Sequence, residues 1–560
     1  MVQDIGLEEA AKTGINKWAQ CMLENSERYT HQVIKKQGTT LDVPLSQMTI
    51  QPGTTIDWID PRDWLAWLVR KGLWTRLAGV GRDEHTAARA VWTEFWDRYR
   101  VIQPHFQLFD MDGIDLSRTA AFLIHGDEGR TLKRQAIMVT ALQSALGYGF
   151  DRKRMAGRVD GPRPLKVNYL GHSFTHRFIM SMMPKTLYES APGSFHNAME
   201  TVAISLKSLL VDGFRDPTTN ELFRVAIIAV KGDAPYLAKV GRLYRSFNTL
   251  VKRGDERTAP KGICHRCLAG TFGYPAEQID TVSPKWLETQ GVKLPWMTTP
   301  AVIKHLAHDL SDPSTFFQGD IWHIVHLGFG RSWVASVIQL VLEVVPAPNL
   351  ETKWQWLTND YKAFCKQSRR QCHISSITPH LMSYNDKTGC MGNWHKGALT
   401  TNFLLWLDGL IGKLPPDAHQ RLSKCQRATV WMNELWSCLF RAEVFLTEEE
   451  CFYVSARGVR FLQTYSMLAK DLFGEQRPWV FPLYGKLHGF HEQMLTVLQH
   501  ARQYKMSPNP VLFCCQIDED AIGKASRLSR RVSIRSVVHR SLQRYLIAAH
   551  SAFTKEGLLR

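Results

Sequence analysis

An unbroken apolar segment that ends in a carboxylate constrains the fold of this chain most. Residues Val225 to Val230 are all apolar, and Lys231, Gly232 and Asp233 follow directly. A continuous run of this kind is typical of a strand that is buried on both faces of a sheet. The sequence therefore predicts an α/β protein in which Asp233 lies at the rim of the core, where the buried strand ends.

The elements around this strand form a recognisable order. We predict strands at 120–124, 136–142, 164–170 and 223–230, a helix at 195–211 after the third strand, and a basic amphipathic helix at 236–251 after the fourth. Gly126-Asp127-Glu128-Gly129 is predicted to be the turn between the first two strands. The ribonuclease H-like fold has this order: three antiparallel strands, then a helix, then a fourth strand that is parallel to the first. We therefore expect a mixed sheet of that type.

The rest of the chain is predicted to be mostly helical. A length of 560 residues is too great for one ordinary core. We expect a helical N-terminal domain at 1–115, the first part of the ribonuclease H-like core at 116–262, a large helical insertion at 263–480, and completion of the core with basic helices at 481–560. A helical insertion before the last helix is a known variation of this fold.

The N-terminal region is rich in tryptophan. Six indoles recur at offsets of three or four residues between charged positions, namely Trp58, Trp64, Trp67, Trp74, Trp92 and Trp96. This spacing favours an amphipathic helical core. The alternative is a set of platforms on which nucleic-acid bases stack.

The charge of the chain favours a polyanionic partner. Lysine and arginine number 69 against 52 aspartates and glutamates, a net charge of +17. DNA is the expected partner, and a basic enzyme without a polyanion is the alternative. The candidates for phosphate contact are Lys239, Arg242, Arg245, Arg527, Arg530 and Arg531. A homodimer is left open, and no membrane association is expected.

Cysteine usage and apolar runs bear on the compartment. The eleven cysteines form no regular framework, and most lie in apolar stretches, so we expect reduced thiols. No run of about 18 apolar residues occurs, and the N-terminus lacks the pattern of a signal peptide. These features predict a nuclear or otherwise intracellular protein.

Carboxylates on separate elements point to metal-dependent chemistry on phosphodiesters. Two Mg²⁺ or Mn²⁺ ions need several acidic oxygens that converge on one place. Asp127 and Asp233 are predicted to lie at the ends of neighbouring strands. The third acid comes from Asp518-Glu519-Asp520, and the sequence offers no means of choosing among the three. Asp320 is a rival for an acidic role.

A structural zinc site is a second candidate. Cys264-x2-Cys267 has the spacing of a zinc knuckle, and His323-x2-His326 places two imidazoles on one face of a helix. Together they would make a Cys2His2 site, although the two pairs are far apart in the chain. Buried thiols and packed histidines are one alternative, and support of the acidic site near Asp320 by the His323–His326 pair is another. Cys372 and His373 could substitute as zinc ligands. Three further side chains could contact phosphate or assist the acidic site, although interior helical packing is favoured for them, namely Lys486, His488 and His491.

Four segments carry a resemblance to a known family. They are Lys231-Gly-Asp-Ala-Pro-Tyr-Leu-Ala-Lys-Val, Ile263-Cys-His-Arg-Cys-Leu-Ala-Gly, Asp320-Ile-Trp-His-Ile-Val-His-Leu-Gly and Cys515-Gln-Ile-Asp-Glu-Asp-Ala-Ile-Gly-Lys. The chain is similar to DDE/D transposases with an insertion domain, of the CACTA-like kind that includes the Plavaka group, in patches over about 116–545. The resemblance implies a core that cuts and joins DNA with Mg²⁺ or Mn²⁺, with Asp127, Asp233 and Glu519 as the three acids.

The expected function is therefore DNA binding with metal-dependent strand cleavage and transfer, in a transposase or a domesticated descendant. One alternative is a nucleic-acid-binding protein that keeps the fold and lacks the reaction. Another is a basic helical interaction protein that does not bind nucleic acid. Motifs of other enzyme classes are missing: the sequence has no Walker-type phosphate loop and no Gly-x-Ser-x-Gly elbow, and Gly328-x-Gly330 lacks the rest of a dinucleotide fingerprint.

Overall fold

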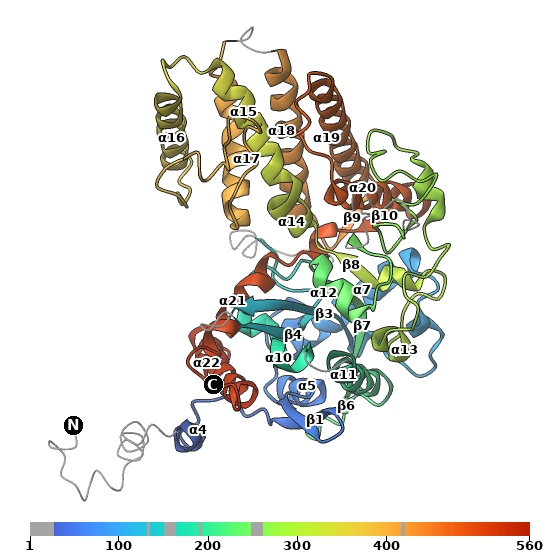
Figure 1. The fold of residues 1–560 in the computed structure, drawn as a ribbon. Coiled ribbons are helices and arrows are strands. Elements are labelled where there is room, and N and C mark those ends of the chain that lie inside the picture. Colours follow the sequence, from blue (N-terminus) through green and yellow to red (C-terminus); the bar gives the residue numbers. More distant parts are fainter. Residues whose placement is uncertain are drawn as a thin grey trace, which may run out of the picture.

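The protein is an α/β protein built around one mixed sheet (Figure 1). The computed structural model describes residues 27–130, 135–150, 164–189, 193–247, 261–415 and 420–559. The strands lie in the order β5-β4-β3-β7-β6, with β8 also paired to β7. Their bounds are β3 Thr119–Arg130, β4 Ala136–Ser144, β5 Arg177–Pro184, β6 Phe214–Arg215, β7 Leu222–Gly232 and β8 Phe317–Gly319. β3, β4 and β5 are antiparallel neighbours, whereas β7 and β8 run parallel to β3.

The buried strand predicted at 223–230 is confirmed as β7, and β4 begins at Ala136 as predicted, but the predicted end of the strand at 120–124 is wrong. β3 continues as a strand through the expected turn at Gly126–Gly129. A Cβ on Gly126 would lie 2.2 Å from the ring of Tyr236, and one on Gly129 would lie 2.5 Å from Cβ of Ser526. These glycines permit close approach of neighbouring helices and form no turn.

The third strand of the sheet is also not the predicted one. Residues 164–170 form only isolated bridges, of Val167 with Leu146 and of Asn168 with Gly149. The strand beside β4 is instead β5, whose eight residues are all buried. Its sequence, Arg-Phe-Ile-Met-Ser-Met-Met-Pro, has no alternation of polar and apolar residues, so the period of a half-exposed strand is missing.

Helices cover both faces of the sheet. The helix predicted at 195–211 is confirmed as α11 (Ser194–Val211), and the C-terminal helix pair as α21 (Gln516–Leu528) and α22 (Val537–Lys555). Successive side chains of a strand point to opposite faces. Gly126 faces α12 and Gly129 faces α21, so these two helices lie on opposite sides of β3.

The basic helix predicted at 236–251 is much shorter in the structure. α12 spans Ala234–Val240, and a turn follows in which Arg242 has φ of +46°. Residues 248–251 of the prediction lie outside the described residues. Asp233 caps the helix, because its side chain accepts a hydrogen bond from the backbone N–H of Tyr236 at 2.8 Å.

The N-terminal region packs onto the sheet and contains a hairpin that the helical prediction missed. Its elements are α4 Glu27–Lys36, β1 Ser46–Gln51, β2 Thr54–Trp58, α5 Pro61–Arg70, α6 Trp74–Leu77, α7 His85–Ile102, η1 Gln107–Asp110 and η2 Leu116–Arg118. The tryptophans singled out in the sequence are all buried in the core that includes the sheet, namely Trp58, Trp64, Trp67, Trp74, Trp92 and Trp96. Trp64 donates to the carbonyl of Ile179 in β5, and Trp96 to that of Thr119 in β3. The prediction that these tryptophans belong to the core is confirmed, and their rings are not free to stack on bases.

A helical lobe lies between β8 and α21 in the sequence and stands above the sheet in Figure 1. It contains α14 Ile321–Ile324, the π-helical turn η6 Val325–Phe329, α15 Gly330–Val344, α16 Leu350–Gln367, α17 Gly397–Ile411, α18 Gln420–Arg441, β9 Phe445–Thr447, α19 Glu448–Gly474, α20 Gly485–Tyr504 and β10 Met506–Pro508. The predicted helical character holds here. In contrast, 263–300 is irregular except for η4 (Lys285–Thr289).

Short elements complete the structure, and one long helix is unusually apolar. The short elements are α9 Ser173–His176, α10 Lys185–Tyr188, α13 Ala301–His305, η5 Pro313–Phe316 and η7 Pro510–Phe513. The continuous helical stretch Ile321–Val344 is the single described helix with the length and composition of a membrane span. Of its most apolar window, 72% is buried inside the protein, as in a core helix.

Candidate functional site: an acidic cluster and a thiol–imidazole cluster

Two aspartates meet at one edge of the sheet because β3 and β7 are parallel and in register. His125 of β3 pairs with Lys231 of β7, and each strand carries its aspartate two positions further on, at Asp127 and Asp233. Side chains two positions apart point to the same face of a strand. Lys231 contacts α21, so the register directs Asp127 and Asp233 towards that helix as well.

The third acid comes from α21, and the structure distinguishes the three candidates. Glu519 lies beside Asp127: one carboxylate oxygen of each, together with a ring nitrogen of His323, lie within 4.8 Å of one another. Asp518 is fully buried between Arg177 and Lys231. Asp520 points elsewhere and pairs with Lys524 at 2.6 Å. Glu519 is therefore the member of the triplet that faces the strand acids.

A fourth carboxylate and an imidazole complete this acidic cluster, which consists of Asp127, Asp233, Asp320, His323 and Glu519. Asp320 caps α14 by accepting a hydrogen bond from the N–H of Trp322 at 2.7 Å. Its other oxygen lies 2.5 Å from Nδ1 of His323. Nε2 of His323 is 3.4 Å from Oε1 of Glu519. Asp320 thus orients an imidazole that links the helical lobe to α21.

Proton affinities in the acidic cluster are strongly perturbed. Burial, followed by the charge of Asp127, raises the pKa of Asp233 to about 6. The same two causes raise the pKa of Glu519. Burial alone would lower the pKa of His323, but its hydrogen bond to Asp320 raises it to about 9. The carboxylates therefore lie so close together that the positive charges of the protein do not fully offset their repulsion.

The donor set of the acidic cluster suits a hard divalent cation. Mg²⁺ and Mn²⁺ prefer carboxylate oxygens, which Asp127, Asp233 and Glu519 supply. Oε1 of Glu519 is buried and receives no hydrogen bond from any described residue. A cation would satisfy that oxygen and would remove the repulsion that raises the pKa values of Asp233 and Glu519.

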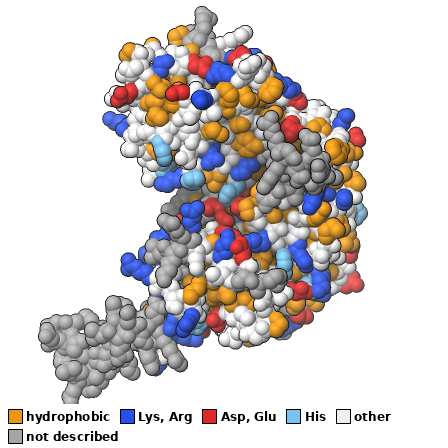
Figure 2. All heavy atoms as spheres, viewed as in Figure 1, with side chains coloured by type: hydrophobic (Ala, Val, Ile, Leu, Met, Phe, Trp, Pro, Cys, Tyr) orange, Lys and Arg blue, Asp and Glu red, His pale blue; other side chains and the backbone are white. Residues whose placement is uncertain are grey.

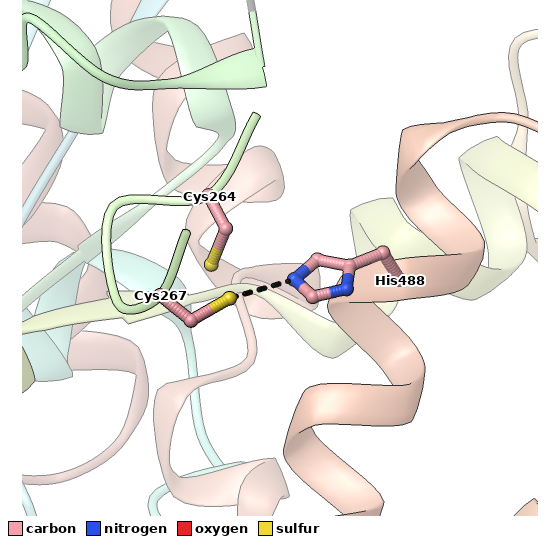
Figure 3. Close-up of side chains that lie close together, drawn as sticks. All are labelled: Cys264, Cys267 and His488. Atoms are coloured by element: carbon pink, nitrogen blue, oxygen red, sulfur yellow. Dashed lines mark hydrogen bonds between the residues drawn. The ribbon is translucent and has the colours of Figure 1, made fainter. Parts of the chain in front are cut away.

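A second cluster joins the thiols of Cys264 and Cys267 to the imidazole of His488 in α20 (Figure 3). Their ligand atoms all lie within 4.8 Å of one another, and the three side chains are buried. Sγ of Cys267 is 3.4 Å from Nε2 of His488. Each sulfur accepts a backbone hydrogen bond, at 3.4 Å from Arg266 and at 3.4 Å from Ala269 respectively. Such bonds favour the thiolate, which is the form that binds a metal.

The knuckle loop that carries the two cysteines is held by an arginine. Arg245 is buried and donates to the carbonyls of Cys264 at 2.7 Å, His265 at 3.1 Å and Lys293 at 2.7 Å. All of its contacts shape the loop, so the prediction that Arg245 binds phosphate is wrong. A buried guanidinium with three carbonyl partners is not available to an external anion.

The predicted Cys2His2 set is also wrong in its histidines. Among the described residues, the ligand group around the cysteines contains His488 and neither His323 nor His326. His323 belongs to the acidic cluster. His326 is buried, and its ring stacks on Trp322 with centroids 3.8 Å apart. Cys372, the proposed substitute ligand, is exposed and bonds the carbonyl of Ile374.

The other lysine and histidine candidates of α20 are Lys486 and His491. Lys486 donates to the carbonyls of His323 at 2.8 Å and Leu327 at 3.3 Å, so it braces α14 and η6. His491 lies one turn beyond His488 in α20. Its Nδ1 has no hydrogen-bond partner among the described residues, and its Nε2 lies 2.8 Å from the carbonyl oxygen of Thr281. Both rings contact Trp286.

The remaining candidates for phosphate contact lie on the surface. Lys239 is half-buried, pairs with Glu128 at 3.0 Å and lies over the ring of Tyr188. Arg242, Arg527, Arg530 and Arg531 are exposed. The last three follow Glu519 along α21 and its C-terminal turn, which places Arg530 about 16 Å from Glu519 at a rise of about 1.5 Å per residue.

The molecular surface is hollowed between the helical lobe and the sheet (Figure 2). Acidic side chains gather in this recess, and lysine and arginine side chains lie along its rim. A cavity of about 590 Å³ adjoins the acidic cluster, with Asp233, Asp320 and His323 in its wall. The recess therefore has acidic side chains at its centre and basic side chains around it.

Sequence reasoning missed the partners that the fold brings from afar. The pairing of His488 with the cysteines, and of His323 with Glu519, joins positions separated by long stretches of chain, and no spacing rule connects them. The Asp-x2-His spacing at Asp320 and His323 was the one local signal, since it matches a helix cap followed by a residue one turn on. In comparisons with known proteins, no family model and no curated protein matches this sequence.

Proposed function

We propose that this protein is a transposase-like enzyme that cleaves and transfers DNA strands on a ribonuclease H-like core. The observation that carries the proposal is that Glu519 of α21 lies beside Asp127 of β3, while the parallel register of β3 and β7 places Asp233 next to Asp127. A sheet in the order β5-β4-β3-β7, with the third acid on a late helix, agrees with the fold expected from the sequence.

The residues fit a reaction that depends on Mg²⁺ or Mn²⁺. Asp127, Asp233 and Glu519 would hold the ions; when bound, the ions supply Lewis-acid chemistry that activates a water or hydroxyl and stabilises the leaving oxygen. The sheet fixes Asp127, and the cap on α12 fixes Asp233. His323 is oriented by Asp320, and its Nε2 lies 3.4 Å from Oε1 of Glu519.

DNA is the proposed substrate because basic side chains surround the acidic centre. The net charge of +17 supplies the long-range attraction, and the exposed arginines of α21 and its turn lie within one duplex width of Glu519. Phosphate contacts of this kind position the DNA and carry no sequence information.

We further propose a structural zinc centre at Cys264, Cys267 and His488. Two thiolates and one imidazole are typical zinc ligands, and structural sites have four. The described residues supply three of these four ligands, because the group within 4.8 Å consists of Cys264, Cys267 and His488. The ion would bind the knuckle loop to α20, and so join the segment after β7 to the helical lobe.

Nicking of supercoiled plasmid DNA tests the proposed enzyme activity. We expect activity in Mn²⁺ or Mg²⁺ and none after chelation. Asp233→Asn and Glu519→Gln should each lower the rate about 100-fold or more, because a lost ligand costs several kcal/mol of transition-state stabilisation. Asp520→Asn is the matched control, since Asp520 pairs with Lys524 and should leave nicking intact.

Two results would replace this proposal by its alternatives. Unchanged nicking by Asp233→Asn and Glu519→Gln would refute the catalytic assignment. Salt-dependent DNA binding without nicking in either metal would identify a nucleic-acid-binding protein that lacks the reaction. Absence of DNA binding at low salt would leave a basic interaction protein.

A further inference from the structure

A large cavity opens beside the acidic cluster. Its volume is about 590 Å³, which lies within the range of about 300–1,000 Å³ that is usual for sites that bind small molecules. It is bounded by α20, β8, the start of α12 and the end of α7. Asp233, Asp320 and His323 belong to its wall, so a group bound at the acidic cluster is continuous with this space.

The wall of the cavity is mainly apolar and aromatic. The aromatic side chains of the wall are Tyr99, Phe106, Phe247, Phe316, Phe317, Tyr484 and Phe513. Val497 and Gly489 of α20 also line the cavity. Apolar and aromatic side chains of this kind favour contact with a planar ring.

Three residues of the wall have a buried side-chain atom with no hydrogen-bond partner among the described residues, namely Arg266 at Nε, His488 at Nδ1 and Gln493 at Oε1. Nε2 of Gln493 donates to the carbonyl of Gly319 at 2.7 Å, which fixes the orientation of the amide. Oε1 of the same side chain is buried and accepts no hydrogen bond from a described residue. A buried acceptor without a partner costs about 1–3 kcal/mol, so a ligand that donates an N–H would be stabilised there.

A positive charge lies between this cavity and the acidic cluster. Lys486 is part of the wall, and Nζ is held by the carbonyls of His323 and Leu327. An ammonium has three donors, and these two bonds use two of them. The third can meet a phosphate oxygen of a chain that passes from the acidic cluster into the cavity.

We propose that the cavity receives a nucleobase that leaves the DNA stack next to the phosphate at the acidic cluster. The inference rests on the proposed function, and it names the form of the substrate: a strand with one unstacked base. Aromatic and apolar walls with a fixed polar group at one edge are what recognition of an extruded base requires. Oε1 of Gln493 would accept an N–H from the base edge, while the neighbouring phosphate lies near Lys486.

Fluorescence of 2-aminopurine tests this proposal, because stacking in DNA quenches the base. Duplexes carry one 2-aminopurine at each position in turn around the cleavage site that the nicking assay maps, and binding is measured in Ca²⁺. We expect a several-fold rise at one position adjacent to the cut. Val497→Trp, which fills the cavity, should abolish the rise, and Gln493→Leu should reduce it by at least half.

Controls separate loss of the cavity from loss of the fold or of DNA binding. Ile204→Trp adds the same ring at a half-exposed position of α11 and should leave the rise unchanged. The proposal is overturned if DNA is bound and cut but no position brightens, or if the rise survives in Val497→Trp. Those outcomes leave the proposed enzyme intact, whereas failure to bind DNA at all overturns both.

Discussion

Nζ of Lys231 in β7 donates a hydrogen bond to Oδ2 of Asp518 in α21 at 2.7 Å, beneath the acidic cluster. Nε of Arg177 in β5 reaches the other carboxylate oxygen at 3.1 Å. All three side chains are buried. The carboxylate therefore fixes the rotation of α21 on the sheet, and the next residue, Glu519, is turned by about 100° towards Asp127.

Asp518→Asn is expected to destabilise the protein strongly. The substitution leaves two buried cations without their counter-charge, a change that typically costs about 3–5 kcal/mol. The free energy of unfolding in urea measures this loss. Asp520→Asn on the same helix removes only a surface pair, worth about 0–1 kcal/mol, and serves as the control. Equal effects of the two substitutions would contradict the role given to Asp518.

Stability of the metal-free protein should fall with pH through the titration of Asp233. Its pKa is raised from 3.8 to about 6 in the folded state, so between these values the folded protein holds a proton that the unfolded chain has lost. The contribution of Asp233 to stability therefore decreases as pH rises from about 4 to 6, by up to about 3 kcal/mol, and this contribution is constant above that pH. Unfolding in urea at a series of pH values measures the slope.

Asp233→Asn provides the comparison for this slope. Asparagine keeps the cap on α12 and cannot ionise, so the decrease attributed to Asp233 should vanish in the variant. Saturating Mn²⁺ should reduce the decrease in the wild type, because the ion favours the ionised carboxylate. A wild-type curve that matches the curve of the variant, without metal, would show that Asp233 titrates normally.

Zinc content should depend on His488 and be independent of His326. His488→Ala removes a ligand next to the thiolates, and bound zinc should drop from about one equivalent to well below half. His326→Phe keeps a ring on Trp322 and should retain zinc. Elemental analysis of the purified variants measures their zinc content. Retention of zinc by His488→Ala, or its loss from His326→Phe, would favour the ligand set expected from the sequence.

An exposed arginine, Arg530, and a buried one, Arg245, should respond differently to replacement by alanine. Arg530→Ala should weaken DNA binding similarly for all sequences and reduce the slope of log affinity against log salt by about 1. Arg245→Ala should instead lower the free energy of unfolding by roughly 2 kcal/mol or more, because three carbonyls lose a charged donor. Fluorescence anisotropy and urea unfolding measure the two effects. A change in salt slope for Arg245→Ala, with unaltered stability, would restore its predicted role.

Local patterns predicted those parts of the fold that depend on neighbours in sequence. The apolar run before Asp233, the helical spacing of 195–211 and the C-terminal helix pair all appear in the structure. Gly126 and Gly129 were misread because glycine serves both turns and close packing, and only the presence of Tyr236 and Ser526 decides between them.

The candidate site was predictable only in its acidic half. Asp127 lies within β3 and Asp233 directly follows β7, and their proximity follows from the parallel pairing of these two strands. The choice of Glu519 over Asp518 required knowledge of which face of α21 meets Lys231, and the triplet offers no local difference. Arg245 has the composition of a phosphate ligand, yet its burial against the knuckle loop is set by tertiary contacts that spacing does not encode.

The position of the helical lobe has a consequence for biosynthesis. About half of the chain lies between Asp233 and Glu519, and the lobe must be made before α21 can dock on β3. A nascent chain on the ribosome would carry Asp127 and Asp233 long before the third acid emerges. Under the proposed function, the acidic cluster would be incomplete until α21 has been synthesised and has docked on β3.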